Sequence, residues 1–257
     1  MSKVGVYSVM PNTIGSGYPT KSGRAITSTQ AVLYDHIEDM KNALERGELD
    51  LIVAPPLLIS RYFERENLSD GFVGVLEDKK PESLVLIVRS DKDINSVKDL
   101  RGKRLGMIEN DELADIFLDT LMLKDLKKSY KTIGLSIHQQ KKINHLILDI
   151  FFDRIDAGVV YMSSFNVMTE LNPEIKNKIK ILEELKIKGK NFSYFRHDYP
   201  LREAMTDVAM GFSDSPRGKL ILEIFKTPEI DFCKVEDLDV FDKLYKDYLR
   251  LKQHKKK

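Results

Sequence analysis

The chain has 257 residues, of which 42% are hydrophobic and 32% are charged, so it can bury a substantial core and is not a disordered polymer. Because 41 Lys and Arg nearly balance 40 Asp and Glu, the net charge of +1 provides no strong field toward nucleic acid or an anionic membrane. No apolar stretch reaches the ~20 residues that a membrane-spanning helix needs. The length suits two lobes of roughly 100 to 150 residues each.

The only cysteine, Cys233, excludes an internal disulfide and has no Cys or His partner at ligand spacing, so no metal site and no cofactor are expected. The basic tail from Tyr245 to Lys257 is expected to be a solvated chain end rather than a nucleic-acid or lipid contact.

Strands and helices are expected to alternate along the chain, starting with an apolar strand and a loop rich in Gly, Pro and Ser from Pro11 to Gly23. Gly47 follows an amphipathic segment at the position of a helix C-cap glycine. The expected strands are 4–9, 26–33, 49–53, 83–89, 103–108, 155–161, 180–182 and 191–195. The expected helices are 35–46, 57–65, 112–123, 138–152 and 163–170, followed by a largely helical C-terminal section.

One layout occurs twice: a helix end, a tight turn, an apolar residue, an Asp and a buried strand. The copies run from Leu44 to Val53 and from Ile150 to Val160, with Asp50 and Asp156 in equivalent places 106 residues apart. This separation is far longer than the period of a solenoid, so the repeat favours two similar α/β lobes, although helix, turn and strand also recur by chance in α/β proteins.

Five phrases in the right order resemble the phosphate/phosphite/phosphonate-type branch of the type 2 periplasmic solute-binding proteins. The most specific runs from Ile94 to Gly106 (INSVKDLRGKRLG) and resembles the phrase that opens the second lobe in that superfamily. The others are Ala43 to Ile52, Phe152 to Val160, Glu170 to Pro173 and Arg217 to Leu222. Together they cover the chain from about Asp35 to Tyr248.

The resemblance implies an α/β, two-lobed type 2 periplasmic-binding-protein fold. Each lobe would be a mixed, mostly parallel sheet flanked by helices, and two β crossovers, near 83–89 and 191–196, would join the lobes. Lobe one would be discontinuous, comprising 1–86 and 197–257, and lobe two would comprise 87–196. A small molecule would be captured in the inter-lobe cleft, with hinge closure over it.

Ligands of open α/β sheets collect beyond the carboxyl ends of the strands, which indicates where the site residues lie. The candidates are Tyr7, Ser8, Tyr34, Pro55, Pro56, Asn110, Asp111, His138, Asp156, Tyr161 and Ser163. Family members place a His near the start of the helix expected at 138–152, and His138 is the match. Family members also place an Asp near the cleft at the position that Asp156 matches, which implies that Asp156 faces a ligand amine. Alternatively, Asp156 fixes the entry of its strand through bonds to backbone groups.

Two features depart from the family. Where phosphonate-binding members have a Ser, Thr and Gly cluster that holds the phosphoryl oxygens, this chain has Glu109, Asn110, Asp111 and Glu112. Carboxylates there would repel a phosphate dianion and suit an amine, a polyol or a metal-bridged ligand, unless they only cap the following helix. The family also places a full helix between Val9 and Ile26, where this chain has a loop-like composition.

The expected function is that of a solute-binding protein, as an ABC-transporter receptor with a permease partner or as a sensory module, with phosphate or phosphonate a doubtful ligand. The chain would be periplasmic if a leader has been removed and otherwise cytoplasmic. No nucleophile elbow, phosphate loop or zinc-protease motif occurs, so no catalytic residue is expected. Two alternatives stay open: a cytoplasmic enzyme on the same fold, of the menaquinone-pathway type, and a ligand-free protein-contact module.

Overall fold

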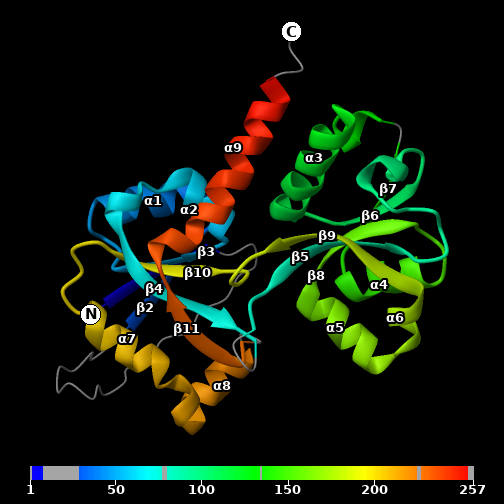
Figure 1. The fold of residues 1–257 in the computed structure, drawn as a ribbon. Coiled ribbons are helices and arrows are strands. Elements are labelled where there is room, and N and C mark those ends of the chain that lie inside the picture. The colour runs from blue at the N-terminus through cyan, green and yellow to red at the C-terminus, as the bar shows by residue number, and fades with distance from the viewer. Residues whose placement is uncertain (1, 8–28, 77–79, 134, 225–226, 254–257) are drawn as a thin grey trace. The chain divides into compact units, whose positions relative to one another are not determined.

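The structure is a computed structural model that describes residues 2–7, 29–76, 80–133, 135–224 and 227–253. The chain divides into two compact units, each with its own sheet (Figure 1). The first unit comprises Met1–Pro81 and Lys188–Asp242, and the second comprises Glu82–Ile187 and Lys243–Lys257.

The sheet of the first unit has six strands in the order β11-β4-β10-β3-β1-β2. Three neighbouring strands are parallel, with β1 between β2 and β3, and the other pairings are antiparallel. The strands are β1 (Ser2–Tyr7), β2 (Thr29–Tyr34), β3 (Leu51–Ala54), β4 (Leu68–Val75), β10 (Phe192–Arg196) and β11 (Glu229–Cys233).

Helices cover both faces of this sheet, with α1 and α2 on one side and α7 on the other (Figure 1). Met40 and Leu44 of α1 are buried one turn apart, and the helix ends before Gly47, whose positive φ of 71° suits glycine. On the α7 side, Phe195 stacks on Tyr199 with ring centroids 5.8 Å apart. The helices are α1 (Ile37–Glu45), α2 (Pro56–Tyr62), α7 (Arg202–Met210), α8 (Pro216–Ile224) and the start of α9 (Asp239–Gln253).

The sheet of the second unit has five strands in the order β7-β6-β8-β5-β9. The first three are parallel, whereas β5 runs antiparallel to both β8 and β9. All seven residues of β5 are buried, and the five between Ser83 and Arg89 are apolar. The strands are β5 (Ser83–Arg89), β6 (Arg104–Ile108), β7 (Ser136–Gln140), β8 (Ala157–Tyr161) and β9 (Ile179–Lys186).

In the second unit α3 lies on one face of the sheet, and α4 and α5 lie on the other (Figure 1). Leu146 and Ile150 of α4 pack into the main apolar cluster of this unit. They approach the sheet closely because β8 has no side chain at Gly158, where a Cβ atom would lie 2.5 Å from Cδ2 of Leu146. The helices are α3 (Glu112–Leu126), α4 (Ile143–Phe151), α5 (Met162–Leu171) and α6 (Glu174–Lys178).

Short 3-10 helices complete the described elements, at η1 (Arg65–Asn67), η3 (Val97–Leu100), η4 (Tyr130–Thr132), η5 (Phe212–Asp214) and η6 (Val235–Leu238). Across the described ranges, none of the helices combines the length and the apolar character that crossing a bilayer requires.

The predicted α/β class with a mixed sheet in each lobe is confirmed. Parallel pairing is limited to three strands per sheet, and the strands β4 and β11 were not expected. The expected departure between Val9 and Ile26 lies outside the described residues.

The unit boundaries differ from the expected ones at three places. Residues 82–86 belong to the second unit because β5 pairs with β9 from Ser83 to Arg89 and with β8 from Leu84 to Val88. Residues 188–196 belong to the first because β10 pairs with β3 and β4. Residues from Lys243 onward group with the second unit, where Tyr245 and Tyr248 line a hollow with Asp115 of α3.

Candidate functional site

Several predicted residues meet at one edge of the second unit's sheet. The parallel strands β6 and β8 end there, at Ile108 and Tyr161. Since β5 is antiparallel to β8 and Leu84 pairs with Tyr161, the start of β5 lies at the same edge. This carboxyl edge therefore brings together the loop after β6, the start of α5 and the residue that precedes β5.

Asp111 caps helix α3. The loop turns at Asn110, whose φ is 60°, and Oδ1 of Asp111 then accepts a hydrogen bond from the backbone N–H of Ala114 at 3.0 Å. The capping role that the sequence left open for Asp111 is therefore present in the structure. Glu109 and Glu112 are exposed on either side of it.

Tyr161 stands beside Asp111 at the end of β8. Burial is the main cause that raises the pKa of the Tyr161 hydroxyl well above its ordinary value, and the charge of Asp111, a hydrogen bond to Asp111 and the charge of Glu82 raise it further. The hydroxyl is therefore protonated at neutral pH and donates to the Asp111 carboxylate.

Ser163 binds the side chain of Glu82. The Ser163 backbone N–H donates to Oε1 of Glu82 at 3.0 Å, and its hydroxyl donates to Oε2 at 2.5 Å. Oε1 also accepts from the backbone N–H of Ser83 at 3.0 Å. Glu82 is 4% exposed, so this is a buried carboxylate held by the first turn of α5.

No sequence signal pointed to Glu82. It ends the run Glu77-Asp78-Lys79-Lys80-Pro81-Glu82, which has the composition of a solvated loop. Its burial results from tertiary pairing, since its carbonyl accepts from the backbone N–H of Ile187 at 2.8 Å.

His138 is not at the start of a helix, and that prediction is wrong. It lies in the middle of β7, an edge strand whose backbone pairs with β6, and His138 aligns with Gly106. Its side chain is exposed and its Nε2 lies 3.1 Å from the hydroxyl of Ser136. The helix α4 begins only at Ile143, because residues 136–140 extend the sheet.

Asp156 lies at the opposite edge of the sheet, before the first residue of β8. Oδ2 accepts from the backbone N–H of Arg104 at 2.8 Å, and Oδ1 accepts from Nη2 of Arg104 at 2.7 Å. The hydrogen bond with Arg104 is the largest cause that lowers the pKa of Asp156. These contacts match the alternative role of Asp156, which is to fix the entry of its strand. Asp156 therefore lies away from the carboxyl edge, at the other end of β8.

In the first unit, the parallel strands also bring predicted residues to one edge. Tyr7 and Tyr34 end β1 and β2 and are direct neighbours in register. Burial, followed by the charge of Glu48, raises the pKa of Tyr34. Pro55 precedes α2 and Pro56 is its first residue. Ser8 lies outside the described residues.

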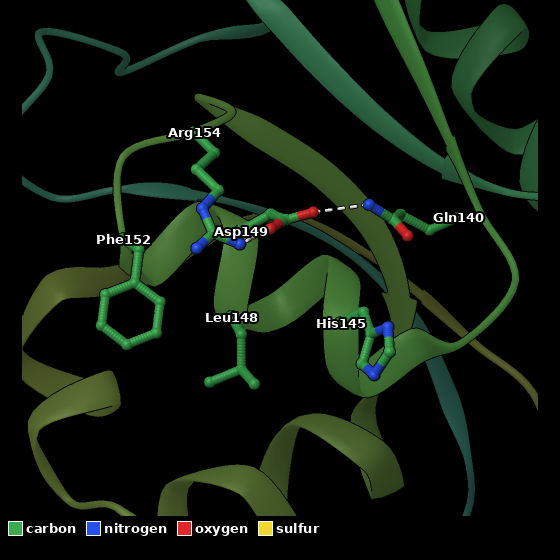
Figure 2. A pocket seen from close by; sticks show the side chains of 6 residues that line it. All are labelled: Gln140, His145, Leu148, Asp149, Phe152 and Arg154. Atoms are coloured by element: carbon green, nitrogen blue, oxygen red, sulfur yellow. Dashed lines mark hydrogen bonds and ion pairs between the residues drawn. The ribbon is translucent and has the colours of Figure 1, made fainter.

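A surface hollow of about 610 Å³ lies along α4 (Figure 2). Three of its polar side chains bind one another, because Asp149 accepts from Nε2 of Gln140 at 2.5 Å and from Nη1 of Arg154 at 3.0 Å (Figure 2). None of the residues predicted from the sequence lines it. The lining residues are Gln140, His145, Leu148, Asp149, Phe152 and Arg154. In the part of the chain that the structure describes, no three His, Cys, Asp or Glu side chains are grouped as metal ligands would be.

Comparison with known proteins decides the family. The model of the periplasmic substrate-binding proteins of phosphonate ABC transporters matches residues 22–237. The chain belongs to this family. Its members are substrate-binding components of ABC transporters, so the chain is a solute-binding protein of that class. The predicted resemblance is confirmed.

Solved structures share the fold at low sequence identity. A protein from Xanthomonas citri, bound to chloride ion, matches with a TM-score of 0.61 and 14% identity, covering 88% of this chain and 86% of its own. The binding-protein component of a phosphonate ABC transporter from Pseudomonas aeruginosa has a TM-score of 0.56 and 11% identity, covering 98% and 87%. A Prochlorococcus marinus protein in complex with methylphosphonate has a TM-score of 0.57 and 12% identity, covering 86% of both chains. No curated protein sequence matches the chain.

Proposed function

We propose that the chain is the receptor of an ABC transporter and that its small-molecule ligand contacts the carboxyl edge of the second unit through Asp111, Tyr161 and Ser163. The observation that carries the proposal is the convergence of three residues on one sheet edge, where Asp111 caps α3, Tyr161 ends β8 and Ser163 lies in the first turn of α5. In the first unit, the strand ends that carry Tyr7, Tyr34 and Pro55 are separate candidates for ligand contact.

The hydrogen-bonding groups of the edge suit a receptor. Tyr161 and Ser163 carry hydroxyls, Asp111 and Glu82 carry carboxylates, and Ser163 belongs to the first turn of α5. Such groups can orient a polar ligand by hydrogen bonds alone. The family consists of transport binding proteins, and we propose that this chain releases its ligand chemically unchanged to a membrane permease.

Thermal unfolding of the chain with a library of amines, polyols, amino acids, phosphate and methylphosphonate tests the proposal. A ligand that binds only the folded protein raises the midpoint in proportion to the logarithm of its concentration. Calorimetry on the best compound should then show weaker binding to Tyr161→Phe and Ser163→Ala. Thr169→Ala, at the far end of α5, is the matched control and should bind like the native chain.

The proposal fails if no compound stabilises the chain. Its assignment of the site fails if Tyr161→Phe and Ser163→Ala bind as tightly as Thr169→Ala. Recovery of a chemically altered compound would identify the chain as an enzyme instead of a receptor.

A further inference from the structure

Two helices of the second unit begin at its carboxyl edge, α3 with 15 residues and α5 with 10. The first backbone N–H groups of a helix have no partner within the helix, and together with the helix dipole they form a natural binding place for phosphate and other oxyanions. What these two N-termini bind therefore decides whether the edge can accept an anion.

In this chain one backbone N–H in the first turn of α5, that of Ser163, binds a carboxylate of the protein itself. The Glu82 carboxylate accepts hydrogen bonds from the Ser163 backbone N–H at 3.0 Å, from the Ser163 hydroxyl at 2.5 Å and from the Ser83 backbone N–H at 3.0 Å. Three donors converging on two oxygens resemble the coordination of a bound oxyanion. The Glu82 carboxylate thus occupies the place that a ligand anion would take at α5.

The position of Glu82 is fixed by its backbone. Its carbonyl accepts from Ile187, and the next residue begins the fully buried strand β5. With 4% of Glu82 exposed, the side chain has little room to leave Ser163. At the N-terminus of α3, the Asp111 carboxylate likewise accepts hydrogen bonds, from the backbone N–H of Ala114 and from the hydroxyl of Tyr161. Lys186, in register with Ser83, is an exposed cation at this edge, and water screens its charge.

We propose that Glu82, together with Asp111, determines the ligand specificity of this edge. The two carboxylates lie at the N-termini of α5 and α3, where a bound oxyanion would otherwise lie. The edge therefore rejects phosphate and phosphonate groups and selects an uncharged or cationic ligand rich in hydroxyl or ammonium donors. The inference rests on the proposed function and names the ligand class of the same site. Rejection follows from two causes. The backbone N–H groups of Ser163 and Ala114 already donate to carboxylates of the protein, and two fixed negative charges repel an approaching anion.

Calorimetric titration with inorganic phosphate, methylphosphonate and ethanolamine tests this inference in the native chain and in Glu82→Gln and Asp111→Ser. The native chain should show no saturable phosphate or methylphosphonate binding at millimolar concentration. Each variant removes one negative charge from a helix N-terminus and should gain at least tenfold in affinity for both oxyanions. Glu170→Gln, an exposed position at the far end of α5, makes the same change in net charge and should gain nothing.

Circular dichroism and a cooperative melt establish that each variant is folded. If the buried substitution Glu82→Gln does not fold, the half-buried Asp111→Ser decides the question. Saturable binding of methylphosphonate by the native chain would overturn the inference while supporting the receptor function. Folded variants that still bind neither oxyanion would also overturn it. A native chain that no library compound stabilises contradicts the proposed function, and a gain of oxyanion binding in the variants would still support the specificity role.

Discussion

Asp156 and Arg104 connect the starts of two parallel strands, since Arg104 is the first residue of β6 and Asp156 directly precedes β8. The carboxylate of Asp156 accepts from the backbone N–H and from the guanidinium of Arg104, and the Asp156 backbone N–H donates to the Arg104 carbonyl at 2.8 Å. Nη2 of Arg104 also donates to Asp153 at 2.8 Å. The side chain of Asp156 is 9% exposed and that of Arg104 is 38% exposed, so the pair is anchored on its buried carboxylate.

Asp156→Asn should therefore destabilise the second unit. The substitution removes charge-assisted hydrogen bonds and places an amide opposite the Arg104 donors, which we expect to lower the free energy of unfolding by about 2 to 3 kcal/mol. Urea unfolding measures the loss. Asp93→Asn, at an exposed carboxylate of the same unit, should change stability by less than about 0.5 kcal/mol. Equal urea midpoints for the two variants would show that the contacts of Asp156 do not stabilise the second unit.

The same pair should make stability depend on acid pH. The pKa of Asp156 in the folded state is lowered, first by the hydrogen bond with Arg104, so its contribution is complete above the unfolded pKa of about 3.9 and is lost as the pH falls through the lower folded value. Between about pH 7 and 5 the difference in unfolding free energy between the native chain and Asp156→Asn should stay constant, and below about pH 4 it should shrink. Urea unfolding at each pH measures this, and a constant difference down to pH 2 would contradict the lowered pKa.

In the second unit, the sequence predicts best those elements whose burial or capping depends on residues adjacent in the chain. The strand β5 consists almost wholly of apolar residues and was expected at its observed bounds, and Asp111 is a favoured cap residue before an apolar helix. The strand β7 was missed because it lies at the sheet edge and contains one apolar residue, Ile137, so its pattern merges with the following helix. Edge pairing is a tertiary property that local periodicity does not record.

The candidate site shows the same limit. Strand ends can be read from the sequence, which brought Tyr161 and Asp111 into the candidate set. The partner of Ser163 is 81 residues away in the chain and belongs to a charged run, so no local pattern links it to α5. Long-range polar pairs of this kind appear only when the sheet is assembled, and here one of them occupies the helix N-terminus.

Replacing Gly71 should cost far more than replacing Gly102. A Cβ atom at Gly71 in β4 would lie 2.2 Å from the carbonyl oxygen of Ser193 in the neighbouring strand, and backbone atoms cannot move aside cheaply. Gly102 has a φ of 73° but open space around its Cβ position, so Gly102→Ala should cost only the left-handed penalty of about 1 to 2 kcal/mol. Gly71→Ala should lose at least about 3 kcal/mol. Comparison of the two urea midpoints checks this order, and the reverse order would contradict the close strand approach.

Removing the charge of Asp111 should lower the pKa of Tyr161 without restoring its ordinary value. Burial is the largest cause of the raised pKa, and the Asp111 charge and hydrogen bond come after it. NMR titration of the labelled tyrosine Cζ carbons, assigned with Tyr161→Phe, compares the native chain with Asp111→Asn. The exposed Glu109→Gln serves as the control and should leave the titration unchanged. An unshifted Tyr161 signal in Asp111→Asn would show that the two side chains do not interact in solution.

Cys233 should react with thiol reagents only when the first unit opens. Its side chain is fully buried, and burial raises the pKa of the thiol to about 12, so the reactive thiolate is scarce at neutral pH. The hydroxyl of Tyr194 lies 3.2 Å from the sulfur and donates to the Lys234 carbonyl, and the sulfur donates to the same carbonyl at 3.9 Å. We expect labelling by Ellman's reagent to be at least about 100-fold slower in the native chain than in guanidinium.

Phe232→Cys in a Cys233→Ala background, where residue 232 is 53% exposed, is the matched control and should react at once. Because the chain has one cysteine, the labelling rate reports opening of the first unit without any substitution, and fast native labelling would contradict the burial of this thiol.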